Sequence, residues 1–215
     1  MALRGKFISF EGIEGVGKST QVARFRAFLE ARGNAVEFVR EPGGTELGED
    51  VRKILKFADY GDCMSAEAEA LLFSAARAQL VREKLLPALS AGVCVVADRF
   101  TDSSVAYQGA GRGLGPEKIA VMNEFATGGL VPDFTVLLDL DPEIGFARTR
   151  SRAGESAEGK TDRMETFPRE FYERVRAAYL QLAAREPQRF FVADASLSPD
   201  EIFEKICIEY ERRFA

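Results

Sequence analysis

The feature that most constrains this chain is a glycine-rich turn near its amino end, Gly12-Ile-Glu-Gly-Val-Gly-Lys18-Ser19, which matches the pattern G-x-x-x-x-G-K-[ST] in full. The preceding run, Lys6–Glu11, has the composition of a strand, and apolar residues recur at helical spacing over Lys18–Ala31. Glycines let the backbone amides of such a turn point inward, and the following helix adds the positive end of its dipole. A strand, this turn and a helix in that order predict a phosphate-binding loop, and a chance match in a glycine-containing turn is the alternative.

Beyond this loop, β-rich runs alternate with helical patterns, which is typical of an α/β fold with a parallel sheet. The run Val93–Asp98 is apolar almost throughout, as expected for a strand buried on both faces. We expect one domain over residues 1–215, with a mobile lid at about 148–163 around the small, polar stretch Ala153–Lys160. Strands are expected at Lys6–Glu11, Ala35–Val39, Val93–Asp98, Phe134–Leu140 and Phe190–Ala193, and helices over Lys18–Ala31, over Ala66–Leu89 and near the carboxyl end.

Composition excludes several kinds of chemistry. The chain contains no histidine, which rules out histidine triads and most catalytic zinc sites. A formal net charge of −5 provides no overall positive field, so nucleic acid is not an expected partner. Cys63, Cys94 and Cys207 are widely spaced and favour a reduced, cytoplasmic protein. We also expect no membrane association, because no apolar run is long enough to cross a bilayer and the first strand begins too early to leave room for a secretory signal.

The end of the loop and the end of a later strand supply candidates for phosphate and metal chemistry. Lys18 suits a bridge to the transferring phosphoryl group, and the Ser19 hydroxyl suits Mg²⁺. Asp98 ends the apolar strand in a carboxylate that would hold or orient the same ion, although strands also end in Asp as a turn signal. Glu11 is a lesser candidate for contact with the ion through water.

Five further blocks fall in a recognisable order along the chain. They are Glu41-Pro-Gly-Gly-Thr45, Leu72-Phe-Ser-Ala-Ala-Arg77, Asp98-Arg-Phe100, Ala106-Tyr-Gln-Gly-Ala-Gly-Arg112 and Val192-Ala-Asp-Ala-Ser196. With the phosphate loop, they make the chain resemble bacterial thymidylate kinases of the lid-arginine type along essentially its whole length. The resemblance implies a P-loop nucleoside monophosphate kinase fold with a five-stranded parallel sheet flanked by helices, a homodimer, ATP with Mg²⁺ as phosphate donor, and transfer to dTMP to give dTDP and ADP in dTTP synthesis.

The chemistry of the thymine edge agrees with this resemblance. Thymine presents an acceptor at O4 and a donor at N3–H, and Arg77, which has donors only, suits O4. By resemblance Phe73 stacks on the base, Arg77 reads O4, and Ser104 with Gln108 completes the edge. Phe73 and Arg77 are one helical turn apart, so both can face one ligand. From spacing alone, a core phenylalanine beside a surface arginine is the alternative.

Other acceptor contacts are implied by the resemblance. Arg99 grips the acceptor phosphate with a planar fork, and Glu14 approaches the sugar 3′-hydroxyl. Tyr107 crowds C2′ and disfavours ribonucleotides, although a plain packing role is an alternative. The turn that begins at Glu41 is expected to close over the acceptor, although Pro and Gly there also fit an ordinary turn.

The donor is expected to lie on the loop and under the lid. The loop carries no arginine, whereas the lid region holds Arg148, Arg150, Arg152, Lys160 and Arg163. We favour Arg152 as the catalytic contact to the transferring phosphate, with Arg148 and Asp194 near adenine; a solvated helix face is the alternative for any one lid arginine. The residues expected to bind the donor are Gly12, Glu14, Gly15, Val16, Gly17, Lys18, Ser19, Thr20, Arg148 and Asp194.

Two other functions are compatible with the phosphate loop. One is a kinase for another nucleoside monophosphate, which an acceptor panel would separate from a dTMP kinase. The other is a P-loop regulatory ATPase, which would hydrolyse ATP without any acceptor. The chain lacks the guanine-reading motif or water-positioning residue that this second class requires.

The lid-arginine interpretation makes a kinetic prediction. Arg152→Ala should lower kcat much more than it raises KM for dTMP, because a lid arginine meets the transferring group mainly in the transition state. Arg99→Ala should instead raise KM, because Arg99 grips the acceptor in the ground state too. Steady-state kinetics on single alanine variants of Arg148, Arg150, Arg152 and Arg163 tests this, and near-normal kcat in all four would contradict a lid-arginine mechanism.

Overall fold

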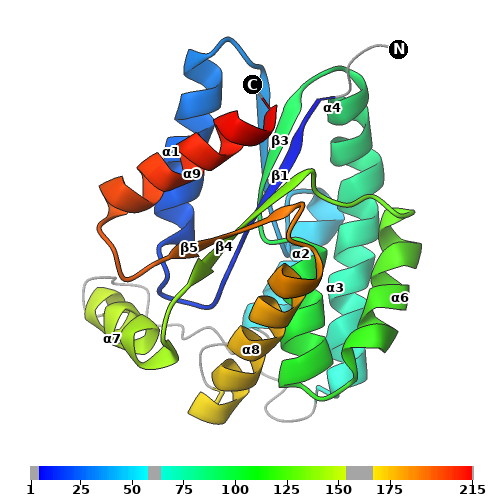
Figure 1. The fold of residues 1–215 in the computed structure, drawn as a ribbon. Helices are drawn as coiled ribbons and strands as arrows, with labels where there is room; N and C mark the ends of the chain where they lie inside the picture. Colours follow the sequence, from blue (N-terminus) through cyan, green and yellow to red (C-terminus); the bar gives the residue numbers. More distant parts are fainter. Residues whose placement is uncertain (1–4, 58–63, 154–166, 215) are drawn as a thin grey trace.

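A five-stranded sheet forms the centre of the computed structural model, which describes residues 5–57, 64–153 and 167–214, without the side chains of 151–153. All neighbouring strands run parallel, in the order β2-β3-β1-β4-β5 (Figure 1). The expected five-stranded parallel sheet is therefore confirmed, with each boundary within one residue of its expected place. The strands are β1 (Phe7–Glu11), β2 (Val36–Arg40), β3 (Cys94–Asp98), β4 (Phe134–Asp139) and β5 (Phe190–Asp194).

The central strand positions the phosphate loop. All five residues of β1 are buried, which explains their apolar composition. In register, Phe10 lies opposite Asp98 of β3 and Glu11 lies opposite Leu137 of β4. The residues that follow these three strands therefore emerge side by side at one edge of the sheet, where ligands of open α/β sheets bind.

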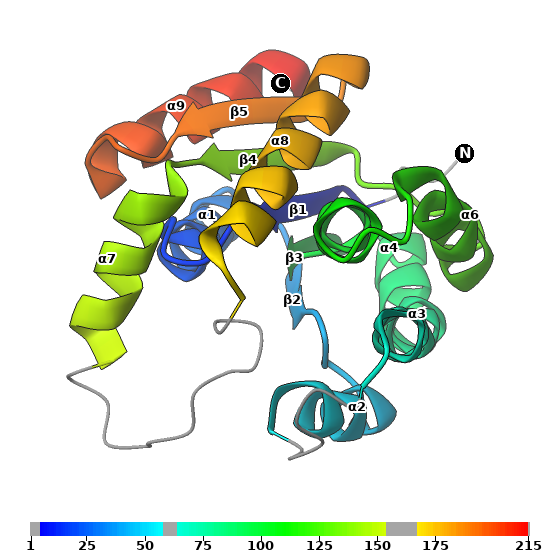
Figure 2. The ribbon, with the colours of Figure 1, turned by 90° about the horizontal axis from the view of Figure 1, so that it is seen from below.

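Helices cover both faces of the sheet. α1 and α9 pack together on one face, while α3 and α8 lie on the other (Figure 2). Val22, Phe25 and Leu29 of α1 are buried, as their spacing predicts. The α-helices are α1 (Lys18–Ala31), α2 (Glu46–Phe57), α3 (Ala66–Leu80), α4 (Leu86–Ser90), α5 (Thr101–Ser104), α6 (Pro116–Thr127), α7 (Pro142–Ala153), α8 (Arg169–Arg185) and α9 (Pro199–Phe214). Within the described residues, no helix has the length and apolar character to span a membrane.

Two π-helical segments interrupt the α-helical pattern. The helix expected over Ala66–Leu89 is present, but its middle, η2 (Val81–Leu85), is π-helical and leads directly into α4. Pro87, near the start of α4, has no N–H to donate to the preceding turn. The second segment, η3 (Val105–Gly111), continues from α5 and carries Tyr107 and Gln108. Such segments occur often at functional sites.

A buried ion pair anchors the helix that follows β3. Arg189, just before β5, donates from both terminal nitrogens to the two carboxylate oxygens of Asp102 in α5, at 2.7 Å each. It also donates to the Thr135 hydroxyl of β4 at 2.8 Å. This arrangement ties α5 to the opposite half of the sheet and so determines where the residues after β3 lie. The expected lid falls largely outside the described residues, as do Cys63, Lys160, Arg163 and the side chain of Arg152.

Candidate active site

The phosphate loop joins β1 to α1 and is packed too tightly for side chains at two positions. Gly12 has φ 134°, and a Cβ there would lie 2.5 Å from the carbonyl oxygen of Leu138. Gly15 has φ 78°, and a Cβ there would collide with the carbonyl oxygen of Gly145 in α7. Both positions therefore require glycine, for conformation and for space. The loop is held between the end of β4 and the first turns of α7.

Lys18 folds back across this loop. Its Nζ donates to the carbonyl oxygens of Gly12 at 2.9 Å and Ile13 at 2.8 Å. Burial, together with the charge of Arg99, lowers the pKa of Lys18 to about 8, while the nearby carboxylates of Asp98 and Glu14 oppose that shift. The ammonium is thus fixed beside the amides of the loop, where it can meet phosphate oxygens.

The two expected metal ligands lie on neighbouring elements. Ser19 is exposed in the first turn of α1, and Asp98 is half-buried at the end of β3. Among the described residues there is no group of three or more His, Cys, Asp or Glu side chains arranged to hold a metal ion. Mg²⁺ needs only one or two protein oxygens when phosphates and waters complete its shell, so these residues fit that ion.

Arg99 is the centre of a polar cluster beside the loop. Its backbone has φ 74°, a conformation that few residues other than glycine adopt. Its Nη2 donates to Glu14 of the loop at 2.8 Å and to the Tyr107 hydroxyl at 3.0 Å, and Tyr107 donates to Glu14 at 2.7 Å. Nη1 donates to Ser103 at 3.0 Å and to Tyr179 of α8 at 3.3 Å. The sequence-predicted Glu14, Arg99 and Tyr107 are therefore brought together.

Glu11, the last residue of β1, binds several of the residues around Arg99. Its carboxylate is fully buried and accepts from the backbone N–H of Phe100 at 2.8 Å and from the hydroxyl of Tyr179 at 2.9 Å. The Ser103 hydroxyl donates to the same group. Burial, then the charge of Asp102, raises the pKa of Glu11 to about 7. These contacts hold Glu11 beside Phe100 and Ser103, next to Arg99. Its water-mediated contact to Mg²⁺ stays a prediction.

A second cluster surrounds Arg77, which is almost fully buried. Its Nε and Nη2 donate to Glu41, and Nη2 also donates to the carbonyl oxygen of Phe100 at 3.2 Å. Its Nη1 donates to the hydroxyl of Ser104 at 3.0 Å and to Oδ1 of Asn123 at 2.7 Å. All five N–H groups of the guanidinium are thus engaged. Burial raises the pKa of Glu41, and the charge of Arg77 opposes that shift.

The remaining acceptor-side residues have separate surroundings. Phe73 is half-buried and packs against a buried apolar cluster formed by Val51, Leu55 and Ala76. Gln108 is buried and donates from Nε2 to Glu69 at 3.0 Å. Its amide nitrogen therefore binds a protein carboxylate.

The expected adenine contacts lie at the far side of the loop. Arg148 of α7 donates to the carbonyl oxygen of Ala195 at 2.9 Å, which ties α7 to the segment after β5. Asp194 accepts from the backbone and hydroxyl of Ser196, and these bonds lower its pKa. The backbone of Arg152 lies in the last turn of α7.

Comparison with known proteins decides the family. The family model for thymidylate kinase matches residues 10–206. The chain belongs to the thymidylate kinase family. It is 48% identical over 204 residues to the thymidylate kinase of Kosmotoga olearia, covering 95% of this chain and 94% of that protein. It is 49% identical to that of Deinococcus radiodurans, covering 94% and 95%. The crystal structure of thymidylate kinase from Ehrlichia chaffeensis is 31% identical, with a TM-score of 0.76 over 97% of this chain and 99% of that one.

Membership of the thymidylate kinase family confirms the enzyme class and the P-loop nucleoside monophosphate kinase fold expected from the sequence. The individual residue roles stay predictions. Sequence reasoning missed Asn123 and Tyr179, which contact Arg77 and Arg99 from 46 and 80 residues away. No local pattern marks such distant partners. Ser103, by contrast, sits directly before Ser104, in the short stretch between two of the recognised blocks.

The lowered pKa of Lys18 predicts how activity depends on pH. The ammonium is present below about pH 8 and is lost above it, so kcat/KM for Mg·ATP should fall by about tenfold per pH unit above that point. Burial raises the pKa values of Tyr107 and Tyr179, so these hydroxyls stay protonated across the same range. Lys18→Arg should be slower but should lack this alkaline limb. A wild-type profile that is flat to pH 9.5 would contradict the prediction.

Proposed function

We propose that this member of the thymidylate kinase family transfers the γ-phosphate of ATP to dTMP, giving dTDP and ADP for dTTP synthesis. The observation that carries the proposal is the position of Glu14. This residue belongs to the phosphate loop, yet its carboxylate binds Arg99 and Tyr107 on the acceptor side. A phosphate on the loop and a phosphate at Arg99 would therefore be neighbours, as phosphoryl transfer requires.

Catalysis in this site would depend on positioning and positive charge. Phosphoryl transfer spreads negative charge over oxygens and needs cations more than a general base, which agrees with a chain that has no histidine. Lys18 would bridge the transferring group and Arg99 would hold the acceptor phosphate. Mg²⁺, held by Ser19 and Asp98, would supply charge neutralisation at the phosphates of the donor. Arg152 would add a further cation from α7, with Arg148 and Asp194 beside adenine.

The Arg77 cluster would select the base. A carbonyl oxygen such as thymine O4 suits a guanidinium, whereas the amino group of cytosine would place a donor against donors. The hydroxyl oxygen of Ser104, which accepts from Nη1 of Arg77, would also accept from N3–H of thymine. Phe73 would stack on the ring, Gln108 would support the edge through Glu69, and Tyr107 would stand near C2′. Every N–H group of Arg77 already has an acceptor in the protein. Thymine O4 would therefore either share an N–H with one of these acceptors or displace that acceptor.

Acceptor selectivity tests the proposed function. ADP release from Mg·ATP should be fastest with dTMP, about tenfold or less slower with dUMP, and more than a hundredfold slower with dCMP, because a lost methyl costs less than an unpaired buried donor. Lys18→Ala should abolish transfer with every acceptor while the protein remains folded. ATP hydrolysis without an acceptor, at a rate that dTMP does not raise, would instead favour a regulatory ATPase.

We also propose a homodimer, built on the outer surface of α3 and α6. Phe125 and Val121 lie one turn apart on α6 and are 89% and 68% exposed, and Leu71 on the neighbouring α3 is 59% exposed. Large exposed apolar side chains gathered on adjacent helices are typical of protein interfaces. A second copy of the chain would cover them symmetrically. A cytoplasmic location stays a prediction.

The dimer proposal predicts the effect of a charge at its centre. Phe125→Glu should shift the protein from twice the chain mass to the chain mass in light scattering at micromolar concentration, because an unpaired carboxylate resists burial. Ile208→Glu on α9, where Ile208 is 58% exposed, is the matched control and should leave the mass unchanged. A wild-type protein that is monomeric at these concentrations would contradict a stable dimer.

A further inference from the structure

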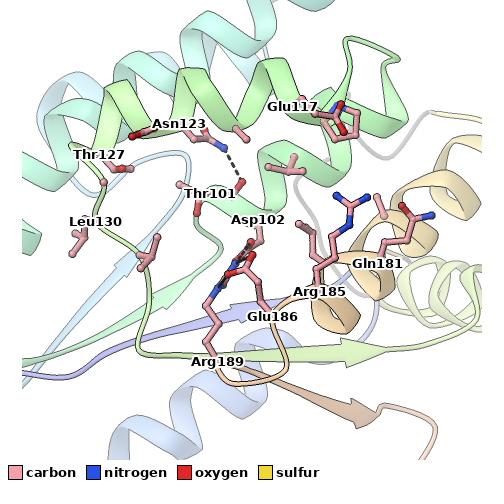
Figure 3. Close-up of a pocket in the computed structure, with 18 residues that line it drawn as sticks. Thr101, Asp102, Glu117, Asn123, Thr127, Leu130, Gln181, Arg185, Glu186 and Arg189 are labelled. Carbon is pink, nitrogen blue, oxygen red and sulfur yellow. Dashed lines mark hydrogen bonds and ion pairs between the residues drawn. The ribbon is translucent and has the colours of Figure 1, made fainter.

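Asn123 is a buried residue of α6 that no motif of the sequence singles out. Only 4% of it is exposed. Its Oδ1 accepts from Nη1 of Arg77 at 2.7 Å, and its Nδ2 donates to the carbonyl oxygen of Thr101 at 3.1 Å. Figure 3 shows the amide directed at Thr101, the first residue of α5. Asn123 thus joins Arg77 to the segment that follows the Asp98-Arg-Phe100 block.

The chemistry of its two partners determines the orientation of the Asn123 amide. Arg77 has donors only, so the amide oxygen must face it, and the carbonyl of Thr101 has acceptors only, so the amide nitrogen must face that side. Aspartate at this position would turn a second acceptor toward the Thr101 carbonyl. Leucine, of similar size, would leave both partners without their bond. Asparagine is suited to both contacts at once.

The acceptors around Arg77 divide into two groups. Glu41 and the carbonyl of Phe100 hold Nε and Nη2, on one edge of the guanidinium. Ser104 and Asn123 hold the two N–H groups of Nη1. Ser104 is the residue expected to meet the base, so Nη1 is the nitrogen nearest the base edge. Nη1 carries two N–H groups in a planar fork, so fixing one of them fixes the direction of the other. Asn123 fixes one, and the second then points toward Ser104 and the base.

We propose that Asn123 is a positioning residue for base selection, which aims Nη1 of Arg77 at the carbonyl oxygen of the acceptor base. This inference rests on the proposed function, because it takes Arg77 to be the base reader. Asn123 does not itself touch the base. It acts by holding one N–H of Arg77, and its own amide is held by Thr101.

The space behind Asn123 makes the idea testable by substitution. A cavity of about 500 Å³ lies between α6 and α8, with the start of α5 at its floor, and Asn123 lines it (Figure 3). Thr127 and Leu130 on the α6 side and Gln181 on α8 line the same cavity. A side chain of similar size at position 123 therefore does not have to displace close-packed neighbours, and Asn123→Leu should fold.

Two substitutions separate the two bonds of Asn123. Asn123→Leu removes both, so kcat/KM for dTMP should fall about tenfold or more, mainly through KM, and the ratio of dTMP to dCMP should fall by a similar factor. Asn123→Asp keeps the acceptor for Arg77 but loses the bond to Thr101, so its selectivity should lie between wild type and Asn123→Leu. Ile119→Val, buried one turn earlier on α6 against Ala70 and Val105, is the matched control and should keep the wild-type ratio.

The experiment is steady-state kinetics with dTMP, dUMP and dCMP on these variants and on Arg77→Gln, with urea unfolding to verify the fold. A drop in the dTMP-to-dCMP ratio in Asn123→Leu, absent in Ile119→Val, supports the inference; if Asn123→Leu does not fold, Asn123→Asp decides. Unchanged ratios in the Asn123 variants, with selectivity lost in Arg77→Gln, overturn the inference alone. Unchanged selectivity in Arg77→Gln overturns it together with base reading by Arg77, and wild-type protein without dTMP phosphorylation overturns the proposed function itself.

Discussion

The pairing of Arg99 with Glu14 connects the two halves of this site. Glu14 belongs to the loop after β1, and Arg99 follows β3, its neighbour in the sheet. The left-handed backbone of Arg99 is less favourable than an ordinary conformation by on the order of 1–3 kcal/mol. It persists because hydrogen bonds of the neighbouring backbone hold it in place. Its backbone N–H donates to the carbonyl of Phe10 at 3.0 Å, and Glu11 holds the next N–H, that of Phe100. The strained backbone directs the guanidinium back toward the loop.

The two arginine clusters differ in burial, and this difference suits different tasks. Arg77 and Glu41 are nearly inaccessible, whereas the side chains of Arg99 and Glu14 are 17% and 19% exposed. A buried pair is costly to desolvate but is held in one geometry by many bonds, as the proposed reading of a base edge by Arg77 requires. A partly exposed pair can exchange partners with an incoming phosphate at lower cost. Phe100 links the clusters, because its carbonyl binds Arg77 and its N–H binds Glu11.

Helix α6 has two distinct faces. Asn123 points inward to Arg77, while Val121 and Phe125, two residues to either side, are exposed. Two residues correspond to a rotation of about 200° around a helix, so these side chains lie on opposite faces. The apolar outer face and the polar inner contact are therefore carried by one rigid element. Its packing against α3 and η3 therefore positions both the exposed apolar face and the contact to Arg77.

The sequence by itself determined the fold class, the phosphate loop and the family, because these depend on local patterns. The apolar strand at Cys94–Asp98 and the pattern glycines Gly12 and Gly17 are readable from local composition and spacing. The sequence did not determine which side chains bind Arg77 and Arg99. Asn123 and Tyr179 lie 46 and 80 residues from them, and only packing of α6 and α8 on the sheet brings these side chains together. Hydrogen bonds between distant residues leave no periodic signal, so tertiary structure alone decided how each arginine is held.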